Sequence, residues 1–249
     1  MKPKVCFRLL RIALHLAEGL ATCALLFPFC RGARRDALVA RWSRRLLGIC
    51  GVTVHQHGAP LAHALLAANH VSWLDIFVIN TLAPAHFVAK AEIRAWPALG
   101  WLAARAGTVF IARGSRRDLR HTFKGIVEQL QAGQRVAFFP EGTTAAQGSL
   151  LPFHANLFEA AIDAGVRLQP LALAYVDANG AFHPAVDFTG EATFASSMLA
   201  ILAGPPVQAH VTWLAPLEGA GAHRRDLSTA AWSAIGTALA DARPAAAAL

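Results

Sequence analysis

Short apolar runs alternate with helical hydrophobic patterns along most of the chain after residue 50. This alternation is typical of an α/β domain in which a mostly parallel central sheet is flanked by helices. We expect strands at residues 52–57, 64–69, 86–90, 108–111, 135–139, 168–176 and 208–214. Helices are expected at residues 72–82, 96–106, 115–131, 154–164, 193–202 and 225–242. The segment 177–190, which contains Asn179-Gly180, is expected to form a hairpin or loop.

An apolar segment at residues 12–30 precedes this alternation and has basic residues on both flanks. It contains His15, Glu18 and Pro28, so it falls short of the roughly 20 uninterrupted apolar residues of a transmembrane helix. A helix that dips into one leaflet fits the pattern better. Arginines follow at once between residues 31 and 35, without a small-residue cleavage site, which disfavours a cleaved signal peptide.

Residues 36–49 have the pattern of a basic amphipathic helix. One arc of the helix is apolar and contains Leu38, Val39, Trp42, Leu46 and Ile49. The opposite arc contains Arg41, Arg44 and Arg45. Such a helix can lie in the headgroup plane of an anionic membrane, or it can pack on the protein core by the same apolar arc. We favour the membrane, because the apolar segment 12–30 is its neighbour in the sequence.

Charge sets the N-terminus apart from the rest of the chain. Of the 249 residues, 55% are hydrophobic and only 15% are charged, and we expect some of the apolar surplus to face lipid. Residues 1–50 hold ten Lys/Arg against two acidic residues, whereas the remainder holds thirteen of each sign, so the net charge of +8 is an N-terminal property. We therefore divide the chain into membrane-associated helices at 1–50, an α/β domain at 51–242 and a frayed tail at 243–249. No nucleic-acid partner is expected, because the α/β body is neutral and the basic arm is interleaved with long apolar runs.

All four cysteines lie within the first fifty residues. Their spacing matches neither a metal site nor a compact disulfide framework. We interpret them as small apolar residues in a reducing compartment and expect no metal site.

A histidine and a carboxylate come directly after the buried strand expected at residues 64–69, in the run Asn69-His70-Val71-Ser72-Trp73-Leu74-Asp75. Ser72 and Asp75 have the spacing of a capping box, so a helix is expected to begin at Ser72. Its buried side would then contain Trp73, Ile76 and Phe77. A neutral His70 can take a proton from a hydroxyl, and Asp75 on its other ring nitrogen would fix the tautomer and stabilise the imidazolium. The alternative is a capping aspartate beside an idle histidine.

An arginine follows the strand expected at residues 108–111, in the run Gly107-Thr108-Val109-Phe110-Ile111-Ala112-Arg113. The carboxyl ends of strands are where α/β domains place their sites. Arg113 is therefore a candidate for a bidentate contact to a phosphate. The basic residues of the next helix are interpreted mainly as an exposed face.

A third polar loop follows the strand expected at residues 135–139, in the run Pro140-Glu141-Gly142-Thr143-Thr144. Gly142 permits a positive φ or a close backbone approach. Thr143 and Thr144 offer hydroxyls and amides to an oxyanion, and Glu141 can accept a hydrogen bond from a substrate hydroxyl or hold a neighbouring arginine. A run with proline and glycine is also typical of an ordinary turn.

Together the three motifs, in this order within about 75 residues, resemble the glycerophospholipid acyltransferase family, which includes the bacterial lysophosphatidate (1-acyl-sn-glycerol-3-phosphate) acyltransferases. The later Leu168-Gln169-Pro170-Leu171 looks like the fourth block of that family. The resemblance covers roughly residues 50–215, and the basic, partly apolar N-terminus is similar to the membrane-seated helices of the family.

This resemblance implies transfer of a fatty acyl group from an acyl-carrier-protein or coenzyme A thioester to the sn-2 hydroxyl of lysophosphatidate, giving phosphatidate, without a metal or other cofactor. It implies that His70 is the general base and Asp75 its orienting partner. A thioester is already activated, so the enzyme need only deprotonate the hydroxyl, align it and stabilise the oxyanion. The expected partners are membrane lipid, a lysophospholipid acceptor and, through the basic N-terminus, an acidic acyl carrier protein. The expected location is the cytoplasmic face of a bacterial inner membrane.

The resemblance also implies a substrate site. Arg113 would be a phosphate ligand, and the cradle for the glycerol phosphate would contain Glu141, Gly142 and Thr143. Lys90, at the end of another expected strand, is a candidate for stabilising the oxyanion. A salt bridge with Glu92 or simple solvation explains Lys90 at least as well.

Two departures from the family pattern leave the acceptor open. His154 stands where a lysine commonly follows the third block, and Ala145 replaces a frequent serine or arginine. Both lie near the expected headgroup cradle. Alternatives are therefore an acyltransferase that acts on another lysolipid, such as lyso-ornithine lipid, and a catalytically silent lipid-binding membrane protein.

Overall fold

The chain folds around one mixed sheet. In the computed structural model, which describes residues 3–111 and 116–242, the sheet has seven strands in the order β1-β7-β6-β2-β5-β3-β4. The strands are β1 (Val52–His57), β2 (Leu65–Ala68), β3 (His86–Lys90), β4 (Val109–Ile111), β5 (Val136–Phe138), β6 (Leu168–Val176) and β7 (Val207–Trp213). Neighbouring strands are parallel except β6 and β7, which are antiparallel. The predicted α/β class is confirmed, and the strand ends differ from the expected ones by at most one residue.

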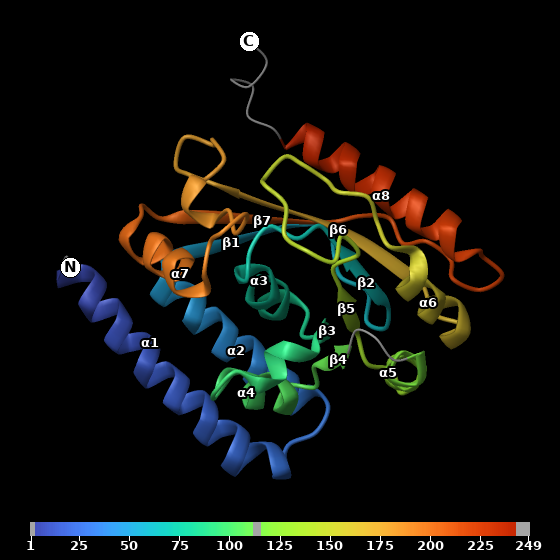
Figure 1. Cartoon of the computed structure of the whole chain (residues 1–249), viewed down its shortest axis with the longest axis horizontal. Helices are drawn as coiled ribbons and strands as arrows, with labels where there is room; N and C mark the ends of the chain where they lie inside the picture. The colour runs from blue at the N-terminus through green and yellow to red at the C-terminus, as the bar shows by residue number, and fades with distance from the viewer. Residues whose placement is uncertain (1–2, 112–115, 243–249) are drawn as a thin grey trace.

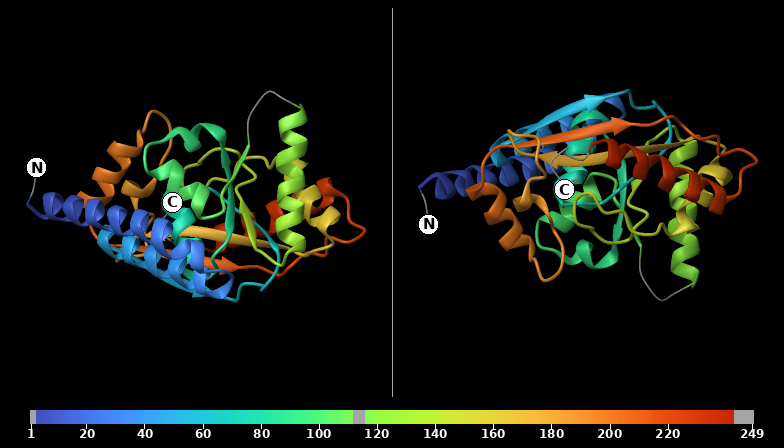
Figure 2. Two further views of the ribbon diagram at one scale, coloured as in Figure 1. Left: turned by 90° about the horizontal axis from the view of Figure 1, so that it is seen from below. Right: turned by 90° about the horizontal axis from the view of Figure 1, so that it is seen from above.

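Helices cover both faces of the sheet. They are α1 (Pro3–Ala21), α2 (Ala33–Cys50), α3 (Leu74–Leu82), α4 (Leu99–Arg105), α5 (Arg116–Gln131), α6 (Glu159–Ala164), α7 (Phe194–Ala203) and α8 (Arg224–Asp241). Alternate residues of a strand point to opposite faces. In β2, Leu66 and Ala68 face a core built with α2, α3 and α7, whereas Leu65 and Ala67 face a second core built with α5, α6 and α8. Figures 1 and 2 show α2 and α3 on the opposite side of the sheet from α8. Burial on both faces explains why every residue of β2 is apolar.

Helices α4 and α6 begin three or more residues later than the sequence predicts. Helix α4 starts at Leu99 instead of residue 96, after a 3-10 turn at Ala91–Ala95. Pro97 cannot donate a backbone hydrogen bond, and Ala98 has a φ of +59°, so the chain turns before the helix starts. The helix expected at residues 154–164 opens as a 3-10 turn at Ala155–Phe158 and becomes α-helical at α6.

The loop after β6 contains the predicted hairpin turn. The N–H of Asp177 donates to the carbonyl of Ala181, and Val176 forms an antiparallel bridge with Phe182. Gly180 has a φ of +80°, which only glycine adopts without strain. A 3-10 turn at Pro184–Val186 then leads toward α7.

The prediction and the structure differ on which N-terminal helix is covered by the rest of the protein. The apolar arc of α2 packs inside the protein, with Leu46 and Ile49 buried, and α2 contributes Leu47 and Cys50 to the core that it shares with α3. The interpretation that α2 lies in the headgroup plane is therefore wrong, and its apolar arc belongs to an ordinary core-packed helix. A helix pattern alone does not distinguish these cases, because a protein core and a lipid phase select the same apolar residues.

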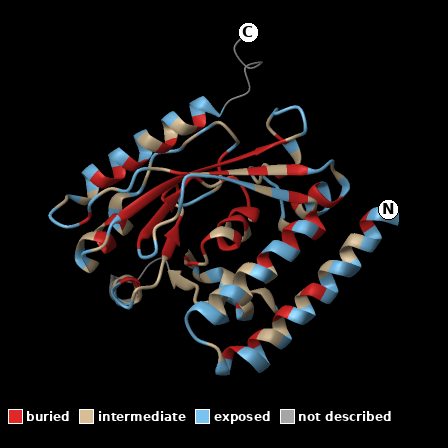
Figure 3. Cartoon of the chain, turned by 180° about the vertical axis from the view of Figure 1, so that it is seen from behind, coloured by how far each residue is buried: buried red, intermediate tan, exposed pale blue. Residues whose placement is uncertain are grey.

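Helix α1 is the outer helix, and much of its surface is exposed (Figure 3). Two of its polar residues face α2: the His15 ring stacks on Trp42 with centroids 4.5 Å apart, and Glu18 pairs with Arg45 at 2.6 Å. The outward face instead carries exposed apolar side chains, with Phe7 61%, Leu10 58% and Leu14 63% exposed. After α1 the helix continues as a π turn at Thr22–Leu26 and a 3-10 turn at Phe27–Phe29, where Pro28 removes a donor. By length and composition alone, the 27 residues Pro3–Phe29 are sufficient to cross a membrane.

Candidate active site

The candidate site lies where several parallel strands end. Strands β2, β5, β3 and β4 run in the same direction, so their carboxyl ends reach the same edge of the sheet. The three motifs follow β2, β4 and β5. Asn69, directly after β2, is buried, and its side-chain amide donates to the Leu173 carbonyl at 2.9 Å and accepts from the Leu173 N–H at 2.8 Å. This pair of hydrogen bonds fixes the end of β2 to β6 immediately before His70.

His70 and Asp75 form a direct pair. The distance between His70 Nδ1 and Asp75 Oδ2 is 2.7 Å, and Asp75 is fully buried. The same Oδ2 accepts from the backbone N–H groups of Val71 at 2.8 Å and Ser72 at 2.9 Å. An ionised Asp75 accepts the Nδ1 proton of His70, which leaves the Nε2 lone pair as the base.

The start of α3 differs from the predicted capping box. The helix begins at Leu74 instead of Ser72, and the Ser72 hydroxyl has no hydrogen-bond partner in the described part of the chain. Asp75 reaches back to the Ser72 N–H, as the acidic member of a capping box does, but the same carboxylate also serves His70. The chain from residue 70 to residue 73 therefore wraps around the carboxylate before the helix starts. The most deeply buried side of α3 includes Leu74, Val78 and Ile79, whereas the expected Trp73, Ile76 and Phe77 are half-buried.

A tyrosine from β6 completes the hydrogen bonding of Asp75. The hydroxyl of Tyr175, which is fully buried, donates to Asp75 Oδ1 at 2.5 Å. Burial, followed by the charge of Asp75, raises the pKa of Tyr175 well above its usual value. Sequence reasoning missed this residue, which is the only tyrosine of the chain and stands in an apolar strand. A buried tyrosine usually has a hydrogen-bond partner, and that rule was the available signal.

The loop after β5 packs around His70. The His70 ring stacks on Phe139, with centroids 3.9 Å apart and planes 10° apart. Glu141 is buried, and its two oxygens accept from the backbone N–H of His70 at 2.7 Å and of Leu151 at 2.9 Å. Burial raises the pKa of Glu141, although these two N–H groups act in the opposite direction. The backbone of this loop also contacts His70 directly, because the Ala145 N–H donates to the His70 carbonyl at 2.8 Å.

The remaining predicted substrate residues around this loop are exposed. Gly142 has a φ of +69° and, like Thr143, lies on the exposed turn after Glu141. The His154 ring lies beside Gly142, since a Cβ added there would be 3.3 Å from it. The histidine that replaces the usual lysine of the family thus lies next to the expected cradle.

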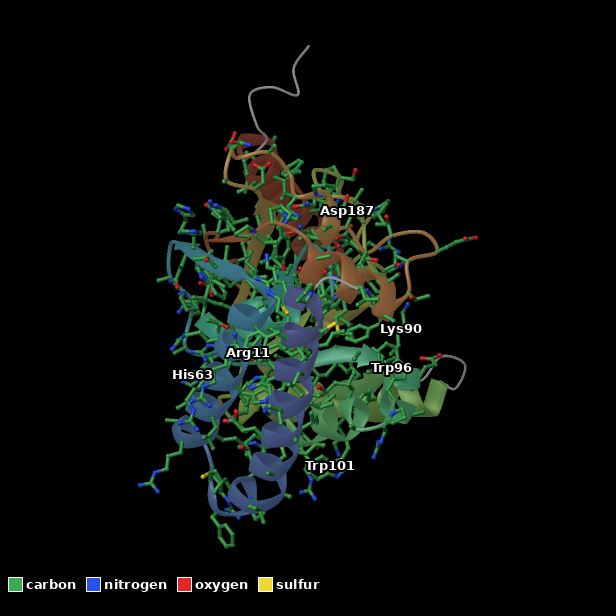
Figure 4. All side chains as sticks on the ribbon, turned by 90° about the vertical axis from the view of Figure 1, so that its left-hand side faces the viewer. Arg11, His63, Lys90, Trp96, Trp101 and Asp187 are labelled. Carbon is green, nitrogen blue, oxygen red and sulfur yellow. The ribbon has the colours of Figure 1, made fainter. Side chains whose placement is uncertain are left out.

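Lys90 and Arg113 follow neighbouring parallel strands. Lys90 is exposed at the end of β3 and forms no ion pair with Glu92 within the described residues. Figure 4 shows Lys90 and Trp96 on the same flank of the molecule. Arg113 comes two residues after the end of β4 and lies outside the described residues.

This arrangement is suited to proton transfer. A buried carboxylate fixes the tautomer of a partly exposed imidazole, whose side chain is 20% exposed, so the imidazole can deprotonate a hydroxyl without itself becoming a nucleophile. Among the described side chains, those of residues 3–111 and 123–242, no three His, Cys, Asp or Glu are placed to hold a metal ion.

Comparison with known proteins agrees with this chemistry. An acyltransferase family model matches residues 51–174. A lyso-ornithine lipid O-acyltransferase of Pseudomonas aeruginosa is 40% identical over 206 residues, which are 82% of this chain and 79% of that protein. A 1-acyl-sn-glycerol-3-phosphate acyltransferase of Neisseria gonorrhoeae is 53% identical over 116 residues, or 47% of this chain and 46% of that protein. The crystal structure of the 1-acyl-sn-glycerophosphate acyltransferase PlsC from Thermotoga maritima shares the fold, with a TM-score of 0.71 and 18% identity over 96% of this chain and 94% of that one. The chain therefore belongs to the glycerophospholipid acyltransferase family and is an acyltransferase of lipid metabolism.

Proposed function

We propose that the protein transfers a fatty acyl group from an acyl thioester to the sn-2 hydroxyl of lysophosphatidate, giving phosphatidate. The observation that carries the proposal is the 2.7 Å hydrogen bond between His70 and the fully buried Asp75. His70 Nε2 takes the hydroxyl proton as the oxygen attacks the thioester carbonyl. The tetrahedral intermediate collapses with cleavage of the C–S bond, and the departing thiolate takes the proton from the imidazolium.

The other site residues position His70, bind the acceptor and stabilise the oxyanion. Glu141 holds the backbone of His70, which keeps the imidazole in register with the acceptor. Arg113 binds the phosphate of the acceptor, and the turn at Gly142 and Thr143 cradles its glycerol. Lys90 is the candidate for stabilising the oxyanion, and this role stays a prediction. The chemistry needs an acyl-carrier-protein or coenzyme A thioester as co-substrate and no metal.

A second acceptor has a specific observation in its favour. The relative that is similar over 82% of this chain is named a lyso-ornithine lipid O-acyltransferase, whereas the Neisseria gonorrhoeae relative is similar over 47%. Lyso-ornithine lipid also presents a free hydroxyl, but its headgroup is an amino acid without phosphate. The departures at Ala145 and His154, beside the expected cradle, are where a change of headgroup would be accommodated.

An acceptor panel separates these candidates. Purified protein in detergent is supplied with labelled acyl-CoA or acyl-carrier protein and with lysophosphatidate, lyso-ornithine lipid or lysophosphatidylcholine. We expect turnover on lysophosphatidate, and preferential turnover on lyso-ornithine lipid would support the second acceptor. In the first case Arg113→Gln raises the KM for lysophosphatidate about tenfold, the value of one charge-assisted contact to phosphate. Absence of turnover on every acceptor would leave a catalytically silent lipid-binding protein and refute the proposal.

The donor is tested in the same assay. Residues 1–50 contain the net positive charge of the chain, which suits both an acidic carrier protein and anionic lipid. We expect acyl-carrier protein to compete with acyl-CoA for turnover. If an excess of carrier protein leaves turnover with acyl-CoA unchanged, coenzyme A is the donor and the basic N-terminus serves the membrane alone.

We further propose that α1 seats the protein on the cytoplasmic face of a bacterial inner membrane. Its outward side chains Phe7, Leu10 and Leu14 are apolar and exposed, while its polar side chains His15 and Glu18 face α2. A shallow hollow between α1 and α4 is lined only by apolar residues: Leu20, Ala21, Ala24, Leu25, Ala98 and Trp101. Such a surface fits the interfacial region of a bilayer, where apolar side chains insert and tryptophans anchor.

Vesicle binding tests this surface. Replacing both Leu10 and Leu14 with serine removes two lipid contacts worth about 1 kcal/mol each, so affinity for anionic vesicles should fall roughly 30-fold. Leu151→Ser is the matched control, because Leu151 is also exposed but lies on a loop held against α8 by Trp232. Equal binding of the double variant and the wild type would contradict the proposed surface.

A further inference from the structure

We propose that Tyr175 is a positioning residue that sets the basicity of His70 through Asp75. The inference rests on the proposed role of His70 as the base. It adds to the pair a third group, which comes from β6 and is 100 residues away from Asp75 in the sequence.

The Tyr175 hydroxyl has one hydrogen-bond partner among the described residues, the Oδ1 atom of Asp75. Asp75 Oδ2 already accepts three N–H groups, from His70, Val71 and Ser72. Tyr175 is the donor that reaches Oδ1, at 2.5 Å, and both residues are fully buried. Without that hydroxyl, Oδ1 would be a buried carboxylate oxygen without a donor, which is a costly state.

The backbone of Tyr175 is held by Gln147, which lies on the loop that follows Glu141. Gln147 Oε1 accepts from the Tyr175 N–H at 2.8 Å, and Gln147 Nε2 donates to the His183 carbonyl at 3.1 Å. The loop that packs around His70 therefore also positions the residue behind Asp75. The raised pKa of Tyr175 keeps its phenol protonated, so it remains a donor over the whole range in which an enzyme is assayed.

The direction of the expected shift depends on the protonation state of His70 in which the hydrogen bond from Tyr175 to Asp75 is strongest. The Tyr175 hydroxyl stabilises the ionised Asp75 most when His70 is neutral, because an imidazolium already compensates part of the carboxylate charge. Removing the hydroxyl thus destabilises the deprotonated pair more than the protonated pair. The pair then retains its proton to higher pH, and the acid limb of the pH–rate profile moves upward.

Tyr175→Phe tests this effect with almost no change of volume. We expect the acid limb of kcat/KM to move up by about half a pH unit or more. The KM values should not change, because the fully buried Tyr175 does not touch substrate. Any ionisation of the acceptor itself is common to wild type and variants and cancels in the comparison.

Thr81→Val is the matched control. It removes a hydroxyl from a buried residue of the same helix as Asp75, where Thr81 donates to the Phe77 carbonyl at 2.9 Å, without touching the pair. Its acid limb should coincide with that of the wild type. An upward shift of equal size in Thr81→Val would show that loosening α3 is sufficient and would overturn the proposal.

The single tyrosine permits a second test that does not depend on the folding of Tyr175→Phe. Growth with 3-fluorotyrosine substitutes only position 175. The fluorinated phenol is more acidic and donates a stronger hydrogen bond, so the acid limb should move down, opposite to Tyr175→Phe. If Tyr175 had only a structural role, the fluorinated enzyme would not shift the acid limb in the direction opposite to Tyr175→Phe. An unchanged or upward-shifted acid limb in the fluorinated enzyme would therefore overturn the proposal.

The fluorine also gives a readout without turnover. Its one ¹⁹F resonance should shift with pH as His70 takes up its proton, and this shift should vanish in His70→Gln. If the wild type acylates no acceptor, the proposed function fails while this titration still tests the coupling. If the wild type is active but the resonance does not titrate, the inference about Tyr175 alone is refuted.

Discussion

Replacing Asp75 with asparagine removes the charge of the pair while its shape is retained. The carboxylate accepts three N–H groups at Oδ2 and one hydroxyl at Oδ1. An asparagine can place its carbonyl oxygen at the Oδ2 position and its amide NH₂ toward Tyr175, whose phenol oxygen can accept. The fold should therefore survive, and the change is mainly electrostatic.

The expected magnitude follows from the distance. An imidazolium and a carboxylate that are in direct contact, with charge centres about 4 Å apart, attract by about 4 kcal/mol at an effective dielectric constant of 20. This attraction is available only when His70 has accepted the proton, so its loss raises the barrier without weakening substrate binding. A barrier higher by about 4 kcal/mol lowers kcat roughly a thousandfold.

The assay is thiol release from the acyl donor, measured together with urea unfolding. Asp75→Asn should lower kcat roughly a thousandfold with KM values close to those of the wild type. Asp187→Asn is the matched control, because among the described residues this half-buried carboxylate accepts only from the Gln147 N–H, and an amide oxygen can do the same. If Asp75→Asn folds normally and retains more than a tenth of kcat, the imidazolium does not depend on Asp75 and the reasoning fails.

One further change tests the surroundings of the pair, and another tests the packing between β3 and the turn before β4. Because the pKa of Glu141 is raised in the folded protein, its contribution to the free energy of unfolding is present below its unfolded-state pKa and is lost as pH rises through the folded value. Glu141→Gln should remove this pH dependence in urea unfolding and, since an amide can accept only one of the two N–H groups, lower kcat/KM about 10- to 100-fold; an unchanged unfolding profile would contradict this. Gly107 has a φ of +91°, and a Cβ there would lie 2.5 Å from the His86 ring, so Gly107→Ala should lower the free energy of unfolding by about 2–4 kcal/mol, whereas a change below about 1 kcal/mol would show that the ring can yield.

The parts that the sequence predicted well are those determined locally. Apolar runs located β2, β5 and β6 because these strands are buried on both faces, whereas β1 and β7 mix apolar and polar residues and are partly exposed. His70 and Asp75 are five residues apart, and a turn between strand and helix is sufficient to bring them together. The local pattern misplaced the first residue of α3, because it does not show that the carboxylate of Asp75 binds His70 and two backbone N–H groups at once.

The parts that the sequence did not predict depend on distant contacts. Tyr175 and Asn69 act across the sheet, through Asp75 and Leu173 respectively, and nothing near either residue in the sequence indicates its partner. The apolar arc of α2 was assigned to lipid because lipid and a protein core select the same residues. Only the placement of α1 outside α2 shows which surface is covered and which remains exposed.

The most direct test of the central claim is acyl transfer by His70→Ala. The imidazole contacts Asp75 and Phe139, while the backbone bonds of His70 to Glu141 and Ala145 do not need its side chain, so the variant should fold. We predict that kcat for acylation of the preferred lysolipid falls roughly 10³-fold or more, with urea unfolding close to that of the wild type. A folded His70→Ala protein that retains a tenth or more of wild-type turnover would contradict the assignment of His70 as the base.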